Sequence, residues 1–305
     1  MAQYTVGDFI KENRIQRGIT QEALSEGICT PATLSKIENG AQTPSRGIYE
    51  ALMQRLGKDD SLFSSYSSKK EMEKQELMFR IGRKMTHKDY DGIEEDYQKL
   101  EECIEEKDRL AQQFLFYSRT IVNRRTGKEE NIDITIRQLI EALHMTQPNF
   151  DVENPARSHF LTCDEIMILN NIAVLSQADG NMTRALRIQF YLKEYMEHNM
   201  VDIKEKGGHY TLILSNLATW LRQVGRVEEG LEMVNLAIDA SIQYGKLALF
   251  PSLLLNKGVI LDLLQRKQEA IETYRQVYYI SRAVKDEARA KRTMELLAKY
   301  GILIE

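Results

Sequence analysis

The apolar side chains between Phe9 and Leu56 recur every three or four residues, and glycine or proline interrupts the pattern between the groups. This spacing places apolar residues on one face of an α-helix, so it predicts four short helices. Gly18, Gly40 and Pro44 are expected to separate helices from one another. The side chains expected to form their common core are Phe9, Ile10, Ile15, Ala23, Leu24, Ile28, Leu34, Ile37, Ile48, Leu52 and Leu56.

The middle of this region has the pattern of two helices that cross at a steep angle. Thr20 and Thr30 are good N-caps, because a threonine hydroxyl can accept a hydrogen bond from a free N–H of the first turn. Pro31 suits the first position of the second helix, where no N–H is needed. Gly27 allows a sharp turn between the helices, and Gly40 ends the second one. These features predict a helix-turn-helix, a motif that places its second helix in the major groove of DNA.

From Lys69 onward the apolar pattern predicts helices joined in pairs. A serine-rich stretch at 58–68 is typical of a linker. The segment 147–155, which has two prolines, and the segment 204–208, which has two glycines, are expected to be non-helical breaks between pairs. The helices are expected at 70–85 and 89–106, 108–124 and 130–146, 163–178 and 181–199, 208–223 and 226–243, and 247–264 and 267–284, with a last helix at 286–299.

Three of these pairs share a pattern of small residues, which indicates an internal repeat. At intervals of 45 and 40 residues, one position of the first helices holds Ala173, Ala218 and Gly258. Twelve residues after each of these, the second helices again have a small residue, namely Ala185, Gly230 and Ala270. Small side chains at both positions let neighbouring helices approach closely, so this half of the chain is predicted to be an array of stacked helix pairs.

The composition favours an all-α protein of the cytoplasm. The chain has only five prolines in 305 residues and is rich in residues with high helix propensity. The three cysteines, Cys29, Cys103 and Cys163, lack metal-binding spacing and are expected to be free thiols in a reducing compartment. No apolar run approaches the roughly 20 residues of a membrane span, and the N-terminus lacks the pattern of a signal peptide. A cytoplasmic protein without a membrane partner is therefore expected.

Two parts of the sequence resemble known families. RIQRGITQ, LSKIENG and the TPS before the fourth helix resemble the Cro and phage-repressor type of helix-turn-helix. GVILDLLQRKQEAIETYRQV, which begins at Gly258, resembles a tetratricopeptide (TPR) repeat, although the repeat interval exceeds the 34 residues of that family and its early tryptophan is absent. Over nearly its full length the chain resembles the RRNPP-type regulators (Rgg, PlcR and PrgX), which are intracellular receptors for short peptides in quorum sensing.

This resemblance implies a fold and a division into domains. We expect an all-α protein with an N-terminal helix-turn-helix domain and its linker at 1–66, followed by a right-handed TPR-like α-solenoid at 67–305. The first domain is expected to bind a double-stranded DNA operator. The second is expected to bind a short signalling peptide and to form a homodimer.

The resemblance also implies which residues contact DNA. Gln21 and Asn39 match phosphate-contacting positions, and Arg46 is a weaker candidate. The residues expected to lie where bases are read are Thr30, Pro31, Ala32, Thr33 and Lys36. Because Pro31 and Ala32 replace longer polar side chains, Lys36 is expected to supply most of the direct readout. The net charge of −4 gives no general support for DNA binding, so binding must depend on placement or on two copies acting together.

Two positions before each small residue of the first helices stands an asparagine: Asn171, Asn216 and Asn256. Because their interval follows the repeat, we expect all three on the concave face of the solenoid, where TPR domains that bind peptides use asparagine. An amide offers a donor and an acceptor to an extended peptide backbone. The alternative is that these asparagines hydrogen-bond neighbouring helices. Further peptide contacts are expected from Met167, Asn170, Val174, Gln177, Thr219, Arg222, Gln223 and Val259, with Arg222 suited to a terminal carboxylate.

Two further contacts are expected. In the phage-repressor pattern an arginine of the first helix pairs with the glutamate that ends the recognition helix, and here these are Arg14 and Glu38; the alternative is two independent surface charges. A two-fold homodimer is expected because one helix-turn-helix of near-zero charge binds DNA weakly alone. The expected dimer contact is the last helix, with Ala290, Met294 and Leu297 on one stripe and Gly-Ile-Leu-Ile beyond it; the alternative is a solenoid cap that faces water.

The sequence contains no recognisable catalytic, metal or cofactor motif. Its five histidines do not form H-E-x-x-H or pair with cysteine at metal-ligand spacing, and no phosphate-binding glycine motif is present. Cys29 is expected to be a core thiol rather than a redox sensor. We therefore expect a peptide-controlled transcriptional regulator that is not an enzyme and needs no cofactor. Two alternatives remain open: a TPR scaffold for protein interactions whose helix-turn-helix mainly dimerises, and a ligand-independent dimeric repressor.

Overall fold

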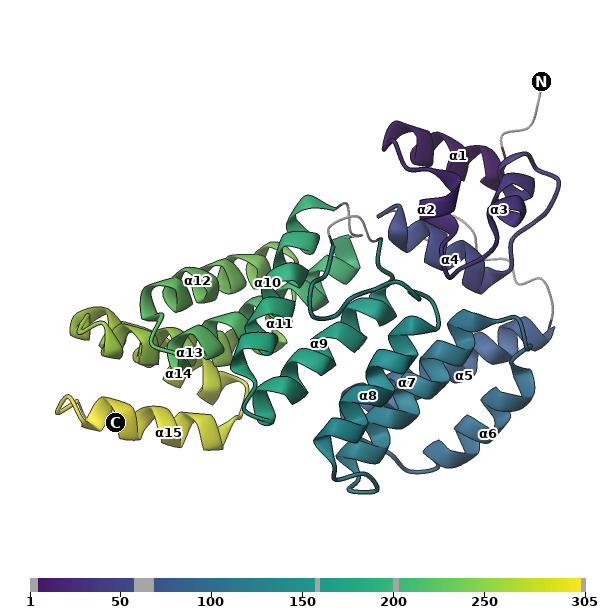
Figure 1. Cartoon of the computed structure of the whole chain (residues 1–305). Coiled ribbons are helices and arrows are strands. Elements are labelled where there is room, and N and C mark those ends of the chain that lie inside the picture. Colours follow the sequence, from purple (N-terminus) through teal and green to yellow (C-terminus); the bar gives the residue numbers. More distant parts are fainter. Residues whose placement is uncertain (1–4, 58–68, 157–159, 200–202, 303–305) are drawn as a thin grey trace. The chain divides into compact units, whose positions relative to one another are not determined.

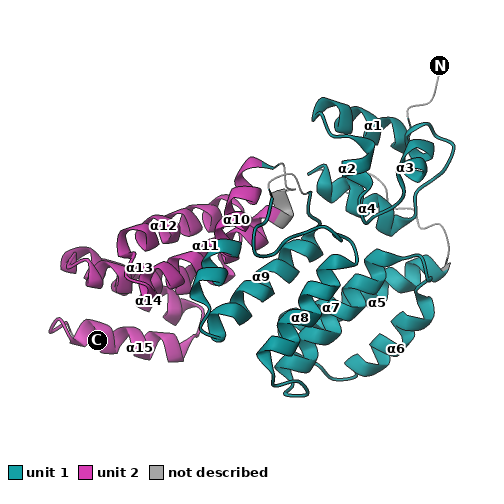
Figure 2. Ribbon diagram, viewed as in Figure 1, with its two compact units in different colours: residues 1–188, 199–202 teal, residues 189–198, 203–305 magenta. Residues whose placement is uncertain are grey.

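The computed structural model describes residues 5–57, 69–156, 160–199 and 203–302 (Figure 1). Within these residues every regular element is a helix, as predicted. The chain divides into two compact units, one of residues 1–188 and 199–202 and the other of residues 189–198 and 203–305 (Figure 2). The predicted linker at 58–68, and with it the predicted domain boundary at 66, lie outside the described residues, so the boundary stays a prediction. No helix in the described part of the chain is long and apolar enough to cross a membrane.

The first four helices are the predicted ones: α1 (Val6–Gln16), α2 (Gln21–Ser25), α3 (Pro31–Glu38) and α4 (Arg46–Arg55). The two expected N-caps are confirmed. The Thr20 hydroxyl accepts a hydrogen bond from the N–H of Ala23 at 3.1 Å, and the Thr30 hydroxyl accepts one from the N–H of Thr33 at 3.1 Å. Each cap satisfies a backbone donor that has no partner inside its own helix, which fixes where α2 and α3 begin.

The core of this domain matches the predicted set with one exception. Ile10, Leu24, Leu34 and Leu52 are fully buried, and Phe9, Ala23 and Ile48 are partly buried and pack against the same core. Ile15 was expected to join them but is 58% exposed, so that prediction is wrong. Five residues of an α-helix turn through roughly 500°, which leaves Ile15 roughly 140° around the axis from Ile10 and away from the core.

The remaining helices follow the predicted pairs. In the first unit they are α5 (Lys69–His87), α6 (Ile93–Cys103), α7 (Arg109–Arg125), α8 (Ile132–His144) and α9 (Cys163–Ala178). The helix α10 (Met182–His198) contributes to both units. In the second unit they are α11 (Ile203–Gln223), α12 (Val227–Gln243), a short 3₁₀ helix (Leu247–Leu249), α13 (Phe250–Leu263), α14 (Lys267–Ala283) and α15 (Glu287–Ala298). The segment 147–155 between α8 and α9 is irregular, as its prolines predicted.

The small residues of the repeat are buried where helices meet. Ala173, Ala185, Ala218 and Ala270 are each 0% exposed. A side chain on Gly258 would place its Cβ 2.4 Å from the ring of Tyr274 on α14, which is closer than atoms can approach. The prediction that small residues allow these helices to pack closely is therefore confirmed.

The segment 204–208 corrects the sequence analysis, because it is not a break. α11 begins at Ile203 and includes both Gly207 and Gly208. A Cβ on Gly207 would lie 2.7 Å from Cβ of Tyr244, at the end of α12, so glycine here permits a close approach of two segments. Gly207 therefore reflects close packing of α11 rather than the end of a helix, whereas Gly208 lies on the exposed side of α11.

These two glycines give a matched pair of substitutions. Gly208→Ala is expected to stabilise the protein by up to about 1 kcal/mol, because no atom lies within 4 Å of the new Cβ and alanine favours helix. Gly207→Ala is expected to be less stable than Gly208→Ala by about 1–3 kcal/mol, because the same gain is opposed by the clash with Tyr244. Denaturant unfolding of the two full-length variants measures this difference. If Gly207→Ala and Gly208→Ala stabilise the protein equally, the close approach of Gly207 to Tyr244 is contradicted.

The last helix, α15, packs on its own chain. Leu297 is 0% exposed and belongs to a cluster with Leu261, Ala270 and Tyr274, and Ala290 is 2% exposed. Two of the three side chains expected in the dimer contact are therefore buried inside the protein, which corrects that prediction. Only Met294 of that stripe is exposed, at 43%.

Candidate functional site

The exposed side of α3 carries the residues predicted to read bases. Pro31, Ala32 and Lys36 are exposed, as is the cap residue Thr30, while Thr33 is half-buried. The opposite side is held in the core by Leu34, Ile37 and Glu38. The surface offered to a groove is thus short and has a single charged side chain, Lys36, among the predicted base-reading positions.

The predicted ion pair between Arg14 and Glu38 is present. Nε of Arg14 lies 2.5 Å from Oε1 of Glu38 and Nη2 lies 2.9 Å from Oε2, so the guanidinium and the carboxylate form two parallel hydrogen bonds. Glu38 is 1% exposed. Its carboxylate raises the pKa of Arg14 above the ordinary value. Nη1 of Arg14 also donates to the carbonyl of Ile19 at 2.9 Å, so this arginine joins α1, the following turn and α3.

The predicted phosphate contacts have partners within the domain. The amide nitrogen of Gln21 donates to Oε2 of Glu38 at 2.7 Å, and Arg46 forms an ion pair with Glu50. Oδ1 of Asn39, at the end of α3, accepts from Nζ of Lys11 at 3.3 Å. Gln21 therefore orients Glu38 in this structure, and its contact with phosphate stays a prediction. The Lys11 contact was not among the predicted ones.

A buried arginine connects the helix-turn-helix to α9. The side chain of Arg55, at the end of α4, is 0% exposed, and Nη1 donates to the carbonyls of Leu24 at 3.1 Å and Glu26 at 2.5 Å. Its Nη2 lies 3.3 Å from Oε1 of Glu165, whose side chain is also 0% exposed. One guanidinium thus holds the end of α2 and reaches the first turn of α9.

The carboxylate of Glu165 is held by several donors of its own segment. It accepts from the hydroxyl of Thr146 at 2.6 Å and from the backbone N–H of Thr162 at 2.6 Å, the second bond being part of a capping box at the start of α9. Gln147 adds longer hydrogen bonds to both carboxylate oxygens. Gly27, in the turn after α2, has a φ of +69°, and a Cβ there would lie 1.6 Å from the carbonyl oxygen of Thr146. The turn of the helix-turn-helix therefore touches the segment between α8 and α9.

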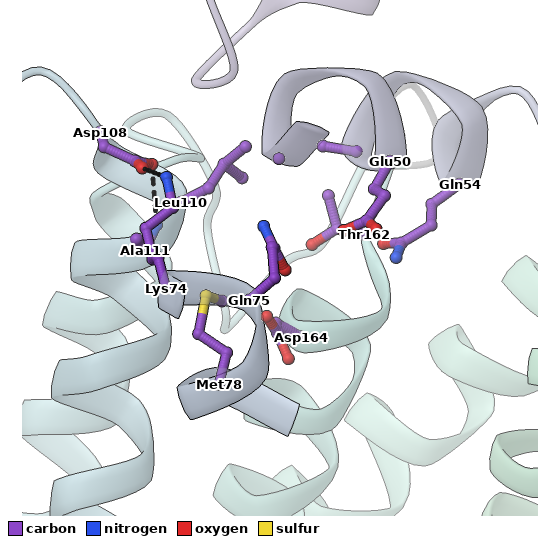
Figure 3. Close-up of a pocket in the computed structure, with 12 residues that line it drawn as sticks. Glu50, Gln54, Lys74, Gln75, Met78, Asp108, Leu110, Ala111, Thr162 and Asp164 are labelled. Atoms are coloured by element: carbon purple, nitrogen blue, oxygen red, sulfur yellow. Dashed lines mark hydrogen bonds and ion pairs between the residues drawn. The ribbon is translucent and has the colours of Figure 1, made fainter. Parts of the chain in front are cut away.

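Beside this contact lies a polar cleft of about 60 Å³ between α4, α5, α7 and α9 (Figure 3). Glu50 and Gln54 line it from α4, and Thr162 and Asp164 from the start of α9. Lys74 of α5 also lines the cleft, and its ammonium group forms ion pairs with Asp108 and Glu71. A space of this size has room for only a few water molecules, so it does not fit an organic ligand.

The peptide residues predicted on α9 differ in accessibility. Met167, Asn171 and Gln177 are half-buried and Val174 is 38% exposed, whereas Asn170 is 4% exposed. The side chain of Asn170 is therefore buried rather than exposed on a groove surface, contrary to what was expected. The amide nitrogen of Asn171 donates to the carbonyl of Met167 at 2.8 Å and lies 3.4 Å from the hydroxyl of Tyr117 on α7.

The other predicted peptide residues belong to the second unit. Asn216, Thr219 and Arg222 of α11 are half-buried, as are Asn256 and Val259 of α13, and Gln223 is exposed. The amide nitrogen of Asn256 donates to the hydroxyl of Thr219 at 3.3 Å, so these two predicted residues are neighbours. This bond and the bond of Asn171 to Tyr117 are of the kind expected if the asparagines join neighbouring helices.

Cys29 is a half-buried thiol in the turn of the helix-turn-helix. Burial raises the pKa of Cys29 to about 11, so its thiol stays protonated at neutral pH. Cys29 packs against the core of the helix-turn-helix, as expected for a core thiol. Within the described ranges, no group of three or more His, Cys, Asp or Glu side chains could hold a metal ion.

Comparisons with known proteins agree with this architecture. Residues 10–63 match the helix-turn-helix family. The crystal structure of Bacillus thuringiensis PlcR with the peptide PapR7 and DNA is similar over 94% of this chain and 98% of that chain, with a TM-score of 0.60 and 22% identity. The apo form of the competence regulator ComR from Streptococcus vestibularis covers 98% of each chain, with a TM-score of 0.51 and 14% identity. No curated protein sequence matches the chain.

These similarities establish the fold over the whole chain. The protein has an N-terminal helix-turn-helix followed by TPR-like helical repeats, as the sequence predicted. The chain therefore shares its fold with PlcR and ComR over nearly its whole length, and its N-terminal residues 10–63 match the helix-turn-helix family.

Proposed function

We propose that this protein is a cytoplasmic, dimeric transcriptional regulator that binds an operator sequence and is controlled by a short signalling peptide. The helix-turn-helix at residues 10–63 supplies the DNA-binding domain. PlcR, which has the same fold, is known in a complex with both a peptide and DNA. The shared architecture supports the proposal that this chain also binds both partners.

The observation that best supports control by a peptide is the position of α9. This helix carries Glu165, in contact with Arg55, at its first turn. Further along the same helix lie residues predicted to contact the peptide, among them Met167 and Asn171. A ligand that shifts α9 would therefore move the carboxylate that Arg55 joins to the end of α2. Because α2 and α3 pack together, such a shift reaches the recognition helix through rigid elements.

The DNA half of the proposal predicts different effects for Lys36 of the recognition helix and for Asn39, which caps the end of that helix. Lys36→Ala is expected to weaken operator binding by about 1–3 kcal/mol and random DNA by less, because Lys36 is the charged side chain at the base-reading positions. Asn39→Ala is expected to weaken operator and random DNA alike, because it matches a phosphate contact. Titration of both variants with an operator selected from random DNA, and with a scrambled duplex, measures these losses. Equal losses for Lys36→Ala on both duplexes would remove its role in specificity.

The peptide half is tested with Asn216→Ala, because Asn216 matches the asparagine that contacts a peptide backbone in TPR domains. Affinity for a synthetic signalling peptide that binds the unsubstituted protein is expected to fall by about 1–3 kcal/mol, with the helical circular dichroism unchanged. Asn235→Ala on α12, a half-buried asparagine outside the predicted set, is the matched control. Calorimetry on the full-length variants measures the loss.

A second candidate function is a ligand-independent dimeric repressor. The hydrogen bonds of Asn171 to Tyr117 on α7 and of Asn256 to Thr219 on α11 favour it, because each joins an asparagine to a neighbouring helix. Two results would support this second function over the first. Operator binding would not change when a peptide is added, and Asn216→Ala would either leave peptide affinity unchanged or unfold the protein.

A further inference from the structure

One side of α5 carries large apolar side chains that stay exposed. Phe79 is 75% exposed, the highest value among the large hydrophobic residues of the described chain. Met72, seven residues earlier and therefore on the same side of the helix, is 37% exposed. A Cβ on Gly82 would meet no atom within 4 Å, so the surface beside Phe79 is open. Neither Phe79 nor Met72 belongs to the DNA-reading or peptide-binding sets.

The charged side chains on this side of α5 are ordered by sign along the helix. Glu73 and Glu76 precede Phe79, whereas Arg80 and Arg83 follow it, and all four are exposed. His87 lies beyond them at the end of the helix and is also exposed. Within the described residues, Glu73, Glu76 and Arg83 form no ion pair. The exposed side therefore has an acidic half and a basic half, with Phe79 between them.

The orientation of α5 is fixed by a buried carboxylate of α6. Asp96 is 4% exposed and lies 3.1 Å from Nη1 of Arg80 and 2.7 Å from Nζ of Lys84. Both cations belong to α5, so the pairs hold this helix against α6. Arg80 is still 44% exposed, which leaves part of its guanidinium accessible to a partner. The side that bears Phe79 is thus presented by a helix that is held in one position.

We propose that this side of α5 binds the same side of α5 in a second copy of the chain, antiparallel, across a two-fold axis between Phe79 and Arg80. The antiparallel copy places Glu76 opposite Arg83 of the second copy, and the symmetry forms this contact twice. Phe79 then lies opposite Arg80 of the second copy, whose guanidinium can stack on the ring. A parallel copy would bring like charges together, so the order of the charges selects the two-fold arrangement.

This proposal rests on the dimer in the proposed function and identifies its surface. One helix pair buries less than the roughly 800 Å² per partner of a standard interface, so we expect the free protein to dimerise weakly. An operator with two half-sites raises the effective concentration of the second copy. The α5 contact then contributes to cooperative binding of two copies on DNA.

Charge reversal tests the contact on the full-length protein. Glu76→Arg and, separately, Arg83→Glu are each expected to raise the dimer dissociation constant about tenfold or more, because each brings like charges together at both symmetric contacts. An equimolar mixture of the two variants is expected to form a heterodimer within about threefold of the original constant, because opposite charges then face each other again. Sedimentation equilibrium gives the constants. Where the free protein is monomeric, the same comparison is made on an operator duplex selected from random DNA.

The apolar part of the contact is tested with Phe79→Ala, which is expected to weaken the dimer about tenfold or more, because the ring is lost at both symmetric positions. The matched control is Tyr279→Ala on α14, since Tyr279 is also an exposed aromatic residue, at 62%. The charge controls are Glu272→Arg and Arg275→Glu, which are exposed on the same helix. All three controls are expected to leave dimerisation unchanged, and circular dichroism verifies the fold of each variant.

The outcomes separate this interface from the dimer itself. Weakening by the single variants, with recovery in the mixture, supports the antiparallel α5 contact. A dimer that resists Phe79→Ala and both charge reversals, which is expected if a different protein binds this side of α5, would overturn the interface and leave the dimer. A mixture that does not recover would also overturn it. A protein that stays monomeric with operator DNA present would overturn both the interface and the dimer.

Discussion

Arg55→Ala is expected to lower the free energy of unfolding of the full-length protein by about 3–5 kcal/mol, the largest effect we expect from a single substitution. The side chains of Arg55 and Glu165 are both 0% exposed. Removal of the guanidinium leaves the Glu165 carboxylate charged in the interior, and it also leaves the carbonyls of Leu24 and Glu26 without this donor. Denaturant unfolding, followed by helical circular dichroism, measures the loss.

A double-mutant cycle separates this pair from its surroundings. Glu165→Gln keeps an acceptor for the N–H of Thr162 but removes the charge. The double variant Arg55→Met with Glu165→Gln is therefore expected to be more stable, by about 0.5–3 kcal/mol, than the summed losses of the single variants Arg55→Met and Glu165→Gln predict. The matched control is Arg46→Ala, which breaks the more exposed pair with Glu50 and is expected to cost about 0–1 kcal/mol. Strict additivity in the cycle would show that Arg55 and Glu165 act independently.

Arg14→Ala is expected to lower the stability of the helix-turn-helix by about 3 kcal/mol, because it strands the buried carboxylate of Glu38. Gln21 continues to donate one hydrogen bond to that carboxylate but does not neutralise its charge. Hydrogen exchange at the backbone amides of Leu34 and Ile37 in α3 reports this local loss in the full-length protein.

The comparison for Arg14 is a neighbouring cation on the same helix. Lys11→Ala removes an exposed hydrogen bond to Asn39 and is expected to change stability by no more than about 0.5 kcal/mol. Similar small effects for both substitutions would mean that the Arg14–Glu38 pair contributes no more than a surface contact.

The sequence by itself determined the helices and the contacts that local rules specify. Thr20 and Thr30 cap their helices because the hydroxyl and the N–H that it accepts from are three residues apart. The small residues Ala173, Ala218 and Gly258 were identified from their interval alone, because every repeat packs against its neighbour in the same way. The Arg14–Glu38 pair followed from the resemblance to a known helix-turn-helix pattern. The caps depend on near neighbours and the small residues on repetition, and a single sequence displays both, whereas the Arg14–Glu38 pair needed the known pattern because its residues are 24 positions apart.

Only the tertiary structure decided which faces of the helices meet and which polar groups are buried together. Arg55 and Glu165 are 110 residues apart, and no local pattern joins a cation at the end of one helix to a capping carboxylate of another. Gly207 had the pattern of a break because glycine has low helix propensity, yet its contact with Tyr244 keeps it inside α11. Ala290 and Leu297 form an apolar stripe that suits a second copy as well as the chain's own α14. Apolar periodicity shows that a helix face is buried but not what buries it, because that depends on helices far away in the sequence.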